Sequence, residues 1–415
     1  MQNDFDLDSE DFGLSPETPS VKPELESSGV PKYAPWHKPR KQWVREKQWW
    51  GSISRYLLQD KEKFVGPQTI RYFGLPGEDL LDVMYLRKNL ENEGAAISIF
   101  GLNHSPESWG RAQVQLSRLL DNPNVSSSSC VVQYSFNDLQ YSHATLFRKV
   151  QESGPFDIVN LDFCDNIISP GFESTRLVAI KNLVDYQLQF HPSPWMLFIT
   201  TRSSKLSSSE DIFHTLYELI KGNLASKEFM DAFSLHFGEA LQGKEDERTL
   251  VARTELSDSH HSKLLIVGLL KWIFQVAVQR MCDAKLTSIV CYDIEGESSE
   301  NDMISLCIKF TKHLSTTSDS SGLTVVRQAP ASIKNSEPLL AARSLSKVAK
   351  MKSVDVILKD DIKLYGQMTK QKMSLLEAAG KAVVDYVDNV CALDLDSFGV
   401  SREEFHNILG AISSD

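Results

Sequence analysis

The sequence predicts an α/β protein with a doubly wound, mostly parallel β-sheet that ends in a β-hairpin. Between residues 69 and 201, short β-branched and aromatic runs alternate with stretches of helical periodicity, as in strands joined by crossover helices. Two further apolar runs, 286–292 and 303–310, are separated only by a polar turn and indicate an antiparallel pair. The 415 residues are 41% hydrophobic and 24% charged, which is typical of a water-soluble globular protein.

Five strand candidates precede this hairpin. They span residues 69–73, 96–100, 130–134, 156–162 and 195–201. After the first of them, apolar residues from Leu81 to Leu90 follow a helical period, and Gly94 ends the segment. Helices are likewise expected at 106–120 and 174–190.

The segments around this α/β region differ from it in composition. The first 31 residues hold eight acidic residues, one lysine and four prolines, a composition that predicts disorder. We expect an acidic tail at 1–31 and a basic and aromatic helical arm at 32–65. The α/β domain should span 66–314, with a helical insert at 209–282. A linker at 315–365 and a helical module at 366–415 should follow, the module with a polar interruption at 393–401.

Net charge, apolar runs and cysteine content limit the partners and the cellular compartment that the sequence predicts. The formal charge is −11, so a general role in coating polyanions is disfavoured unless basic residues are clustered. The longest apolar stretch, 264–278, is interrupted by Lys271 and Gln275, and the chain starts with acidic residues, so neither a membrane span nor a signal peptide is expected. Six cysteines without a CxxC pair predict free thiols in a reducing, cytoplasmic compartment.

Short polar motifs follow the predicted strands. The first strand ends in GLPG at 74–77, the second leads into FGLNHSPE at 100–107, the third into YSFND at 134–138, and the fourth into NLDFCD at 160–165. Loops at the carboxyl ends of parallel strands gather at one edge of the sheet, where ligands bind in such folds. Together with the order of five β-α units and a hairpin, these segments resemble class I S-adenosylmethionine (SAM)-dependent methyltransferases.

The resemblance implies a role for each motif. Gly74 and Gly77 would let SAM approach the backbone, and Asn103 would stand where the family has a ribose-binding acid. Asp138 would lie near the adenine, and Asp162 and Asp165 would face the methyl acceptor as candidate catalytic residues.

The sequence also departs from the family pattern. The glycine loop holds only two glycines and a proline. Asn103 stands in place of the ribose-binding acid, and this replacement removes a charge-assisted hydrogen bond. Whether the chain is an active enzyme therefore stays open. A catalytically degenerate domain, kept as a scaffold or sensor in a multi-protein assembly, is the alternative, and the acidic tail and C-terminal helices could contact such protein partners.

Other chemistries have weaker support in the sequence. It contains no GxxxxGK[ST], GxSxG or HExxH motif, so nucleotide hydrolysis, hydrolase-elbow and zinc chemistry are not indicated. A dinucleotide-binding domain is disfavoured because no GxGxxG follows the first strand. Cys164 could be a nucleophile or a buried thiol, and His260 and His261 have no third metal ligand at a useful spacing.

The arm at 32–65 suggests a substrate. Residues 32–63 carry nine Lys and Arg against three acids, together with four of the seven tryptophans. Cations meet phosphates and indoles stack on unpaired bases, so Arg40, Lys41, Arg45 and Trp49 are expected to bind nucleic acid. The other interpretation is an amphipathic helix that docks its tryptophans on the sheet. The sequence thus predicts a SAM-dependent methyltransferase that acts on nucleic acid.

Overall fold

The computed structural model describes residues 33–58, 68–171, 173–192, 194–243, 249–294, 302–312 and 336–412. The chain divides into two units, Met1–Ala34 and Pro35–Asp415, and the second unit is the subject of everything below. The acidic tail predicted at 1–31 lies outside the described residues.

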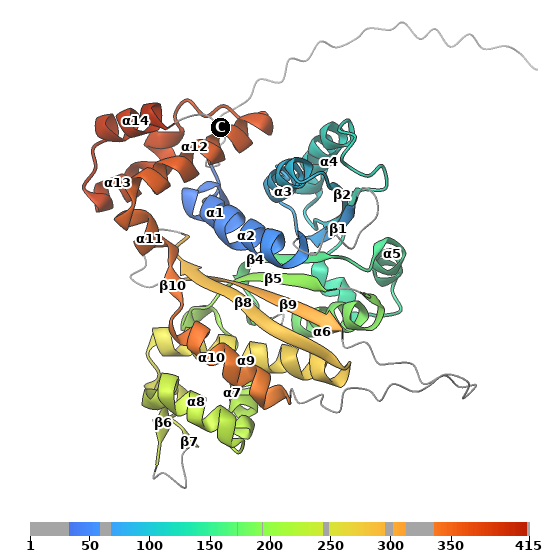
Figure 1. Ribbon diagram of the computed structural model, residues 1–415, viewed down its shortest axis with the longest axis vertical. Helices are drawn as coiled ribbons and strands as arrows, with labels where there is room; N and C mark the ends of the chain where they lie inside the picture. The colour runs from blue at the N-terminus through green and yellow to red at the C-terminus, as the bar shows by residue number, and fades with distance from the viewer. Residues whose placement is uncertain are drawn as a thin grey trace, which may run out of the picture. The chain divides into compact units, whose positions relative to one another are not determined.

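A single eight-stranded sheet organises the second unit, in the order β10-β8-β9-β5-β4-β1-β2-β3 (Figure 1). Neighbouring strands are parallel except that β9 runs antiparallel to both β5 and β8. The strands are β1 (Thr69–Gly74), β2 (Ala96–Leu102), β3 (Cys130–Val132), β4 (Ile158–Asn166), β5 (Trp195–Arg202), β8 (Cys282–Tyr292), β9 (Met303–Lys312) and β10 (Lys352–Ser353). This arrangement confirms the doubly wound, methyltransferase-like sheet with a terminal hairpin.

The strand order reverses between β1 and β4. The chain first runs outward through β1, β2 and β3, and then returns to place β4 on the other side of β1. Such a reversal leaves a crevice at the carboxyl ends of the two strands, because their crossover helices lie on opposite faces of the sheet.

Helices cover both faces of the sheet. In Figure 1, α3 and α4 lie above the sheet and α6, α9 and α10 lie below it. The helices of the α/β region are α3 (Leu81–Asn92), α4 (Pro106–Leu120), α5 (Thr145–Ser153), α6 (Glu173–Phe190), α7 (Glu210–Asn223), α8 (Lys227–Phe237), α9 (Asp258–Gln279) and α10 (Glu337–Ala349). Within 209–282, the described residues form α7, α8 and α9 and a small hairpin of β6 (Leu241–Gln242) and β7 (Thr249–Leu250).

Helix α9 (Asp258–Gln279) is a largely buried helix of the core. It is the one described helix that is long and apolar enough to cross a membrane, and 72% of its most apolar window is buried inside the protein. It packs against β8, α6, α7 and α10, as a core helix of a large domain does. The central strand β5 is likewise buried on both faces over Trp195–Thr201, which explains its unbroken run of apolar residues.

Part of the predicted linker is folded. Residues 337–360 form α10, β10 and α11 (Val354–Asp360), and β10 adds to the sheet by pairing with Val290 and Cys291 of β8. The C-terminal module contains α12 (Ile362–Ala378), α13 (Ala392–Phe398) and α14 (Arg402–Ala411). Its main interruption lies at 379–386 and a second at 399–401, whereas the sequence predicted one at 393–401. Positive φ angles at Gly380 and Gly399 end the preceding helices.

The arm is a helical segment over residues 39–58 that includes α1 (Pro39–Trp43) and α2 (Gly51–Ile53). It lies over the sheet on the side of α3 (Figure 1). Trp49 Nε1 faces Ser305 Oγ at 3.4 Å, and farther along the arm Tyr56 meets Lys309. The arm therefore runs along β9, away from the carboxyl edge of the parallel strands.

Candidate active site

A cavity of about 750 Å³ lies at the carboxyl edge of the sheet. Its walls come from the segments that follow β1, β2, β3 and β4, and from residues 292–294 and Met303 at the hairpin. The first residues of the arm, including Lys38, Arg40 and Lys41, also line it. Of the six predicted cofactor and catalytic residues, Gly77, Asn103, Asp162 and Asp165 line this cavity, and Gly74 and Asp138 do not.

Gly74, the last residue of β1, and Gly77, in the loop that follows, are glycines for different physical reasons. A Cβ atom on Gly74 would stand 2.6 Å from Cε1 of Tyr72, so Gly74 is required by packing within the strand. A Cβ atom on Gly77 would meet nothing closer than Trp36 Nε1 at 4.0 Å, and Gly77 lines the cavity. A third glycine, which the sequence did not single out, is Gly101, where a Cβ would stand 2.8 Å from Pro76 Cγ.

Asn103 joins the loops after β1 and β2. Its Nδ2 donates to Pro76 O at 3.2 Å and to Ser108 Oγ at 2.8 Å, and its Oδ1 accepts from Ser105 N at 3.2 Å. The side chain is 8% exposed. Asn103 therefore shapes the cavity wall, and an acid at this position could not make its bond to the Pro76 carbonyl, since a carboxylate donates no hydrogen bond.

Asp138 caps a short helical turn. Its Oδ2 accepts from Ser135 N at 3.1 Å, while Ser135 Oγ accepts from Asn137 N at 3.2 Å, a reciprocal arrangement that satisfies the first amides of the turn. The carboxylate thus acts behind the wall, and the preceding residues 134–137 are the ones that line the cavity.

Asp162, at the end of the central strand β4, makes an ion pair with the arm. Its Oδ1 lies 2.5 Å from Lys41 Nζ, which also lies 3.5 Å from the Tyr292 hydroxyl and 4.7 Å from the centre of the Trp49 ring. Burial raises the pKa of Asp162 against the opposing effect of Lys41. Burial alone would lower the pKa of Lys41, but the charge of Asp162 outweighs it and the pKa is raised. Lys41 therefore stays protonated in the cavity wall.

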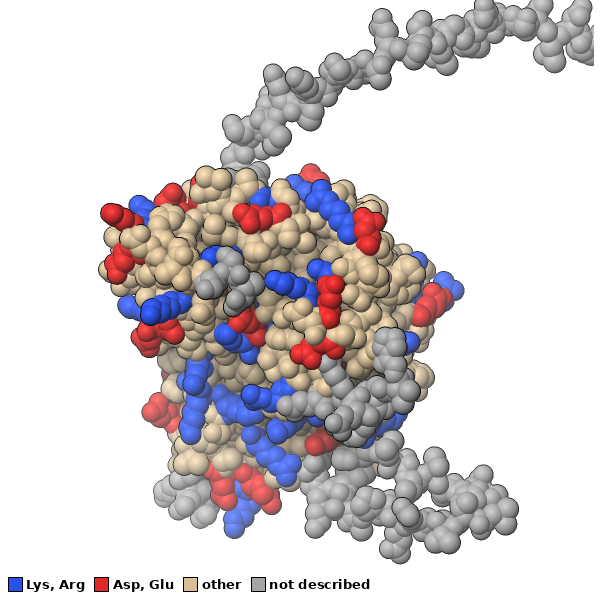
Figure 2. Space-filling view, turned by 45° about the horizontal axis from the view of Figure 1, so that its top comes forward, with Lys and Arg blue, Asp and Glu red and all other residues tan. Residues whose placement is uncertain are grey.

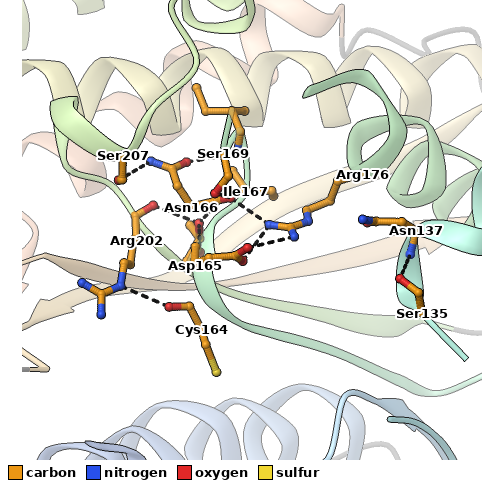
Figure 3. A network of polar contacts seen from close by, with 12 residues as sticks. Ser135, Asn137, Cys164, Asp165, Asn166, Ile167, Ser169, Arg176, Arg202 and Ser207 are labelled. Carbon is orange, nitrogen blue, oxygen red and sulfur yellow. Dashed lines mark hydrogen bonds and ion pairs between the residues drawn. The ribbon is translucent and has the colours of Figure 1, made fainter. Parts of the chain in front are cut away.

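Asp165 is held by an arginine. Arg176 Nη1 and Nη2 donate to its two oxygens at 2.7 and 3.0 Å, and Nη1 also donates to Asn166 O at 2.8 Å. Figure 3 shows the Asp165 and Arg176 side chains pointing toward one another, with the Cys164 sulfur pointing the other way. The bidentate pair fixes the turn after β4, so Asp165 contributes to the shape and charge of the site.

Cys164 lines the cavity and is accessible from it. Burial by the surrounding protein, reinforced by the charge of Asp162, raises the pKa of its thiol to about 11. A thiol with this pKa is protonated near neutral pH and is a poor nucleophile, which disfavours the covalent alternative.

The arm residues predicted to bind nucleic acid are buried. Arg40, Lys41, Arg45 and Trp49 are 5, 4, 3 and 1% exposed. Arg40 pairs with Asp394 and Asp355, and Arg45 Nε lies 2.5 Å from Asp82 Oδ1. Their charges are matched by carboxylates inside the protein, so this part of the arm presents no surface to phosphates. The docked amphipathic helix, the other interpretation of the sequence, describes the structure.

Some residues at or near the cavity were not identified from the sequence. Asp79 accepts from His37 at 3.2 Å and pairs with Lys381 at 3.0 Å, which connects the first loop, the arm and the C-terminal module. Burial lowers the pKa of His37 to about 4, so its ring is neutral near pH 7. Lys38 also lines the cavity, and it has no ion pair within the described ranges.

No metal centre is visible in the described part of the chain, where no three His, Cys, Asp or Glu side chains are grouped to hold an ion. His260 instead lies 3.5 Å from Glu239 and 3.0 Å from Ser257 Oγ, and His261 packs edge-on against Phe213. Both histidines have structural roles at the start of α9.

The reversed β9 strand, the strand order around β1 and the cavity at their carboxyl edge define a Rossmann-like protein of the class I methyltransferase type. The chain belongs to the PP_RS20740-like family, whose model matches residues 31–390. A comparison with curated proteins finds no match.

Solved structures of methyltransferases are similar to part of this chain. The methyltransferase domain of a bacterial Hen1 is 15% identical, with a TM-score of 0.30 over 65% of this chain and 98% of that one. An rRNA methylase from Streptococcus thermophilus is 10% identical, with a TM-score of 0.28 over 59% and 89%. Geranyl diphosphate C-methyltransferase from Streptomyces coelicolor is 10% identical, with a TM-score of 0.27 over 68% and 88%.

Proposed function

We propose that this protein binds SAM in the cavity and transfers its methyl group to a nucleic acid. The observation that supports this most directly is that one cavity collects the loop after β1, the Asn103 region, residues 134–137 and Asp162. In a doubly wound sheet these four segments are where a nucleotide-like ligand and its reacting partner meet.

The residues present fit a ligand of this kind. A volume of about 750 Å³ lies within the range of small-molecule sites. Gly77 leaves its part of the wall free of side-chain atoms, and Leu102 and Phe136 provide apolar surface of the kind that an adenine ring packs against. Lys38 supplies a cation that could meet the carboxylate of the cofactor, while the carboxylates of Glu78 and Asp79 stand on the same wall.

Asn103 changes how a ribose would be recognised. Its amide already bonds to Pro76, Ser108 and Ser105, so the hydroxyls of the ribose would depend on neighbouring groups such as His104 and the Ser105 hydroxyl. Recognition at this point would therefore be weaker than with a charged acceptor.

When bound, SAM supplies a methyl group made electrophilic by a positively charged sulfur. The chain itself would orient the acceptor. Asp162 Oδ1 is engaged by Lys41, whereas its Oδ2 makes no hydrogen bond to any residue the structure describes and could accept one from the amine or hydroxyl of the acceptor. Residues of the docked arm line the cavity and would keep water from the reacting groups on that side.

Titration calorimetry with SAM and with its demethylated product tests the proposal. Wild-type protein should bind both, whereas Gly77→Val should bind neither and keep its melting temperature, because the branched side chain would occupy cavity space. Gly222→Val is the matched control, since Gly222 also has open surroundings but lies in α7, outside the residues that line the cavity. Absence of binding in the wild type, or equal binding by wild type and Gly77→Val, contradicts the proposal.

The second candidate function is a scaffold or sensor without methyl transfer. The ion pairs Lys41–Asp162 and Arg176–Asp165, together with the internal bonds of Asn103, favour it because they use groups that an enzyme would offer to its ligands. Cofactor binding without transfer of a labelled methyl group to RNA or DNA would support this candidate.

A further inference from the structure

Two lysines stand directly opposite each other on neighbouring strands. Lys285 of β8 and Lys309 of β9 are register partners in the antiparallel pair, so their side chains leave the same face of the sheet. Like charges in this position repel one another. Neither lysine has an ion pair with any described residue.

Further basic residues surround this pair. Lys347 of α10 donates to Leu286 O and Thr287 O on the open edge of β8, and burial followed by the charge of Lys285 lowers its pKa. Lys352 of β10 is the register partner of Val290, which shares the face of Lys285 on β8, and it is exposed. We call Lys285, Lys309, Lys347 and Lys352 the basic face.

The basic face lies beside the arm and extends toward the cavity. Tyr56, near the end of the arm, places its ring 5.5 Å from Lys309 Nζ and is only partly buried. Lys309 is six residues from Met303, which lines the cavity, and this separation corresponds to about 20 Å of strand. Figure 2 shows Lys and Arg side chains gathered below the middle of the face in view, the half that holds β8, β10 and α10 in Figure 1.

This concentration of charge is unusual in a chain with a net charge of −11. Arg40, Lys41 and Arg45 of the arm are neutralised by carboxylates of the fold, whereas Lys285, Lys309 and Lys352 have no ion pair with any described residue. Holding like charges together costs stability, and an anionic partner would offset that cost.

We infer that the basic face binds single-stranded nucleic acid and holds it beside the arm, as the acceptor for the cavity. The inference rests on the proposed function, whose acceptor it delivers. Phosphates would meet the lysines, and a base could stack on Tyr56, which requires that base to be unpaired. The hydroxyl of Ser288, near Lys285 on β8, adds a further donor for phosphate oxygens.

The binding of a labelled single-stranded oligonucleotide, measured by fluorescence anisotropy at several salt concentrations without SAM, tests this inference. The test variant replaces Lys285, Lys309 and Lys352 by Gln, which removes charge and keeps a polar side chain of similar length. The control variant carries Lys88→Gln, Lys181→Gln and Lys227→Gln, which are exposed, have no ion pair with described residues, and change the net charge equally. Both variants should keep the wild-type melting temperature or exceed it.

We expect the test variant to bind at least about tenfold more weakly near physiological salt, and its plot of log Kd against log salt to flatten by about 0.7 per lost contact, or about 2 in total. Tyr56→Ala should weaken binding without changing this slope, because stacking releases no counterions. Equal slopes for the test and control variants, or no binding by wild type at low salt, would overturn the inference. Displacement by poly-glutamate at the same charge concentration would assign the face to acidic polypeptides instead.

The readout separates this inference from the proposed function. Loss of oligonucleotide binding in the test variant with unchanged SAM binding supports the basic face. SAM binding without any oligonucleotide binding would leave a methyltransferase whose acceptor is not a nucleic acid. Salt-sensitive oligonucleotide binding without SAM binding would keep the basic face and reject the enzyme.

Discussion

Lys41 Nζ in the arm lies 2.5 Å from Asp162 Oδ1 at the end of the central strand β4. The two side chains are 5 and 18% exposed, so this is an ion pair in the wall of the cavity rather than on the outer surface. It ties the arm to a carboxylate of the sheet, and both residues line the cavity. The arm is thus part of the site, because its cation sets the charge and the position of Asp162.

Replacing Asp162 by Asn should destabilise the protein by about 3 kcal/mol, because Lys41 would remain buried without a counter-charge. Urea denaturation measures this, with Glu91→Gln as the control, since it breaks an exposed pair with Arg87 and should cost less than about 1 kcal/mol. The double variant Lys41→Met/Asp162→Asn should recover most of the loss. If the two substitutions simply added, the ion pair would not be the cause.

Gly74 and Gly77 should respond in opposite ways to alanine. The Cβ atom of Gly74→Ala would press on the ring of Tyr72, which is fully buried and cannot move away, so we expect a loss of about 1–3 kcal/mol. Gly77→Ala should change the free energy of unfolding by less than about 0.5 kcal/mol, since its surroundings are open. Denaturation of the two variants in parallel checks this, and equal losses would contradict the assignment of packing to one and cavity space to the other.

The fold could be predicted because its signals are local. Each strand from β1 to β5 is an apolar run bounded by turn residues, and the hairpin β8–β9 has only a short polar connection. Strand β10 has only two residues and is defined by its pairing with Val290 and Cys291. A segment this short has no local sequence pattern that predicts a strand.

The site was predicted less completely, for a physical reason. Gly77 and Asn103 stand in the loops after β1 and β2 and Asp162 lies within β4, and the topology brings all three to one edge of the sheet. The arm cations find their partners far along the chain: Asp162 is 121 residues from Lys41, and Asp394 is 354 residues from Arg40. Basic residues interleaved with tryptophans are equally compatible with a nucleic-acid-binding surface and with a helix whose cations form buried ion pairs. The positions of the distant carboxylates, which the local sequence does not show, distinguish the two.

Acid should destabilise the protein through His261. This side chain is fully buried against Phe213, and neither ring nitrogen has a hydrogen-bond partner among the described residues. Burial, followed by the charge of Arg253, lowers its pKa to about 4 from the usual 6.5. The unfolded chain therefore binds the proton more readily. The stability contributed by the neutral ring is complete above about pH 6.5 and is lost as the pH falls toward 4.

His261→Leu should remove this dependence. We expect the free energy of unfolding of the variant to fall less between pH 7 and pH 4.5 than that of the wild type, by on the order of 2 kcal/mol. Urea titrations at the two pH values measure the difference. His260→Leu, on the partly exposed neighbouring ring, is the control and should follow the wild type. Parallel curves for wild type and His261→Leu would show that another group causes the acid sensitivity.

The C-terminal module should control how firmly the arm closes the cavity. Arg40 Nη1 and Nη2 donate to the two oxygens of Asp394 at 2.7 Å each, and Tyr365 donates to Asp394 Oδ2 at 2.9 Å. Burial alone would lower the pKa of Arg40, but Asp394 and Asp355 outweigh it and raise the pKa, so the guanidinium is charged and depends on these two carboxylates.

Asp394→Ala would leave a buried arginine with one carboxylate in place of two, and should destabilise the protein by about 3 kcal/mol. Loss of this anchor should also loosen the arm, so backbone amides at 39–58 should exchange with deuterium faster than in the wild type, while those of α9 keep their protection. Asp388→Ala is the matched control, because its carboxylate is 62% exposed and its pair with Arg402 spans 3.6 Å. Mass spectrometry of the three proteins under native conditions gives the comparison. If the arm exchanged at the wild-type rate in Asp394→Ala, the Arg40–Asp394 pair would not be what holds it, and its other contacts, such as Arg45–Asp82, would fix its position.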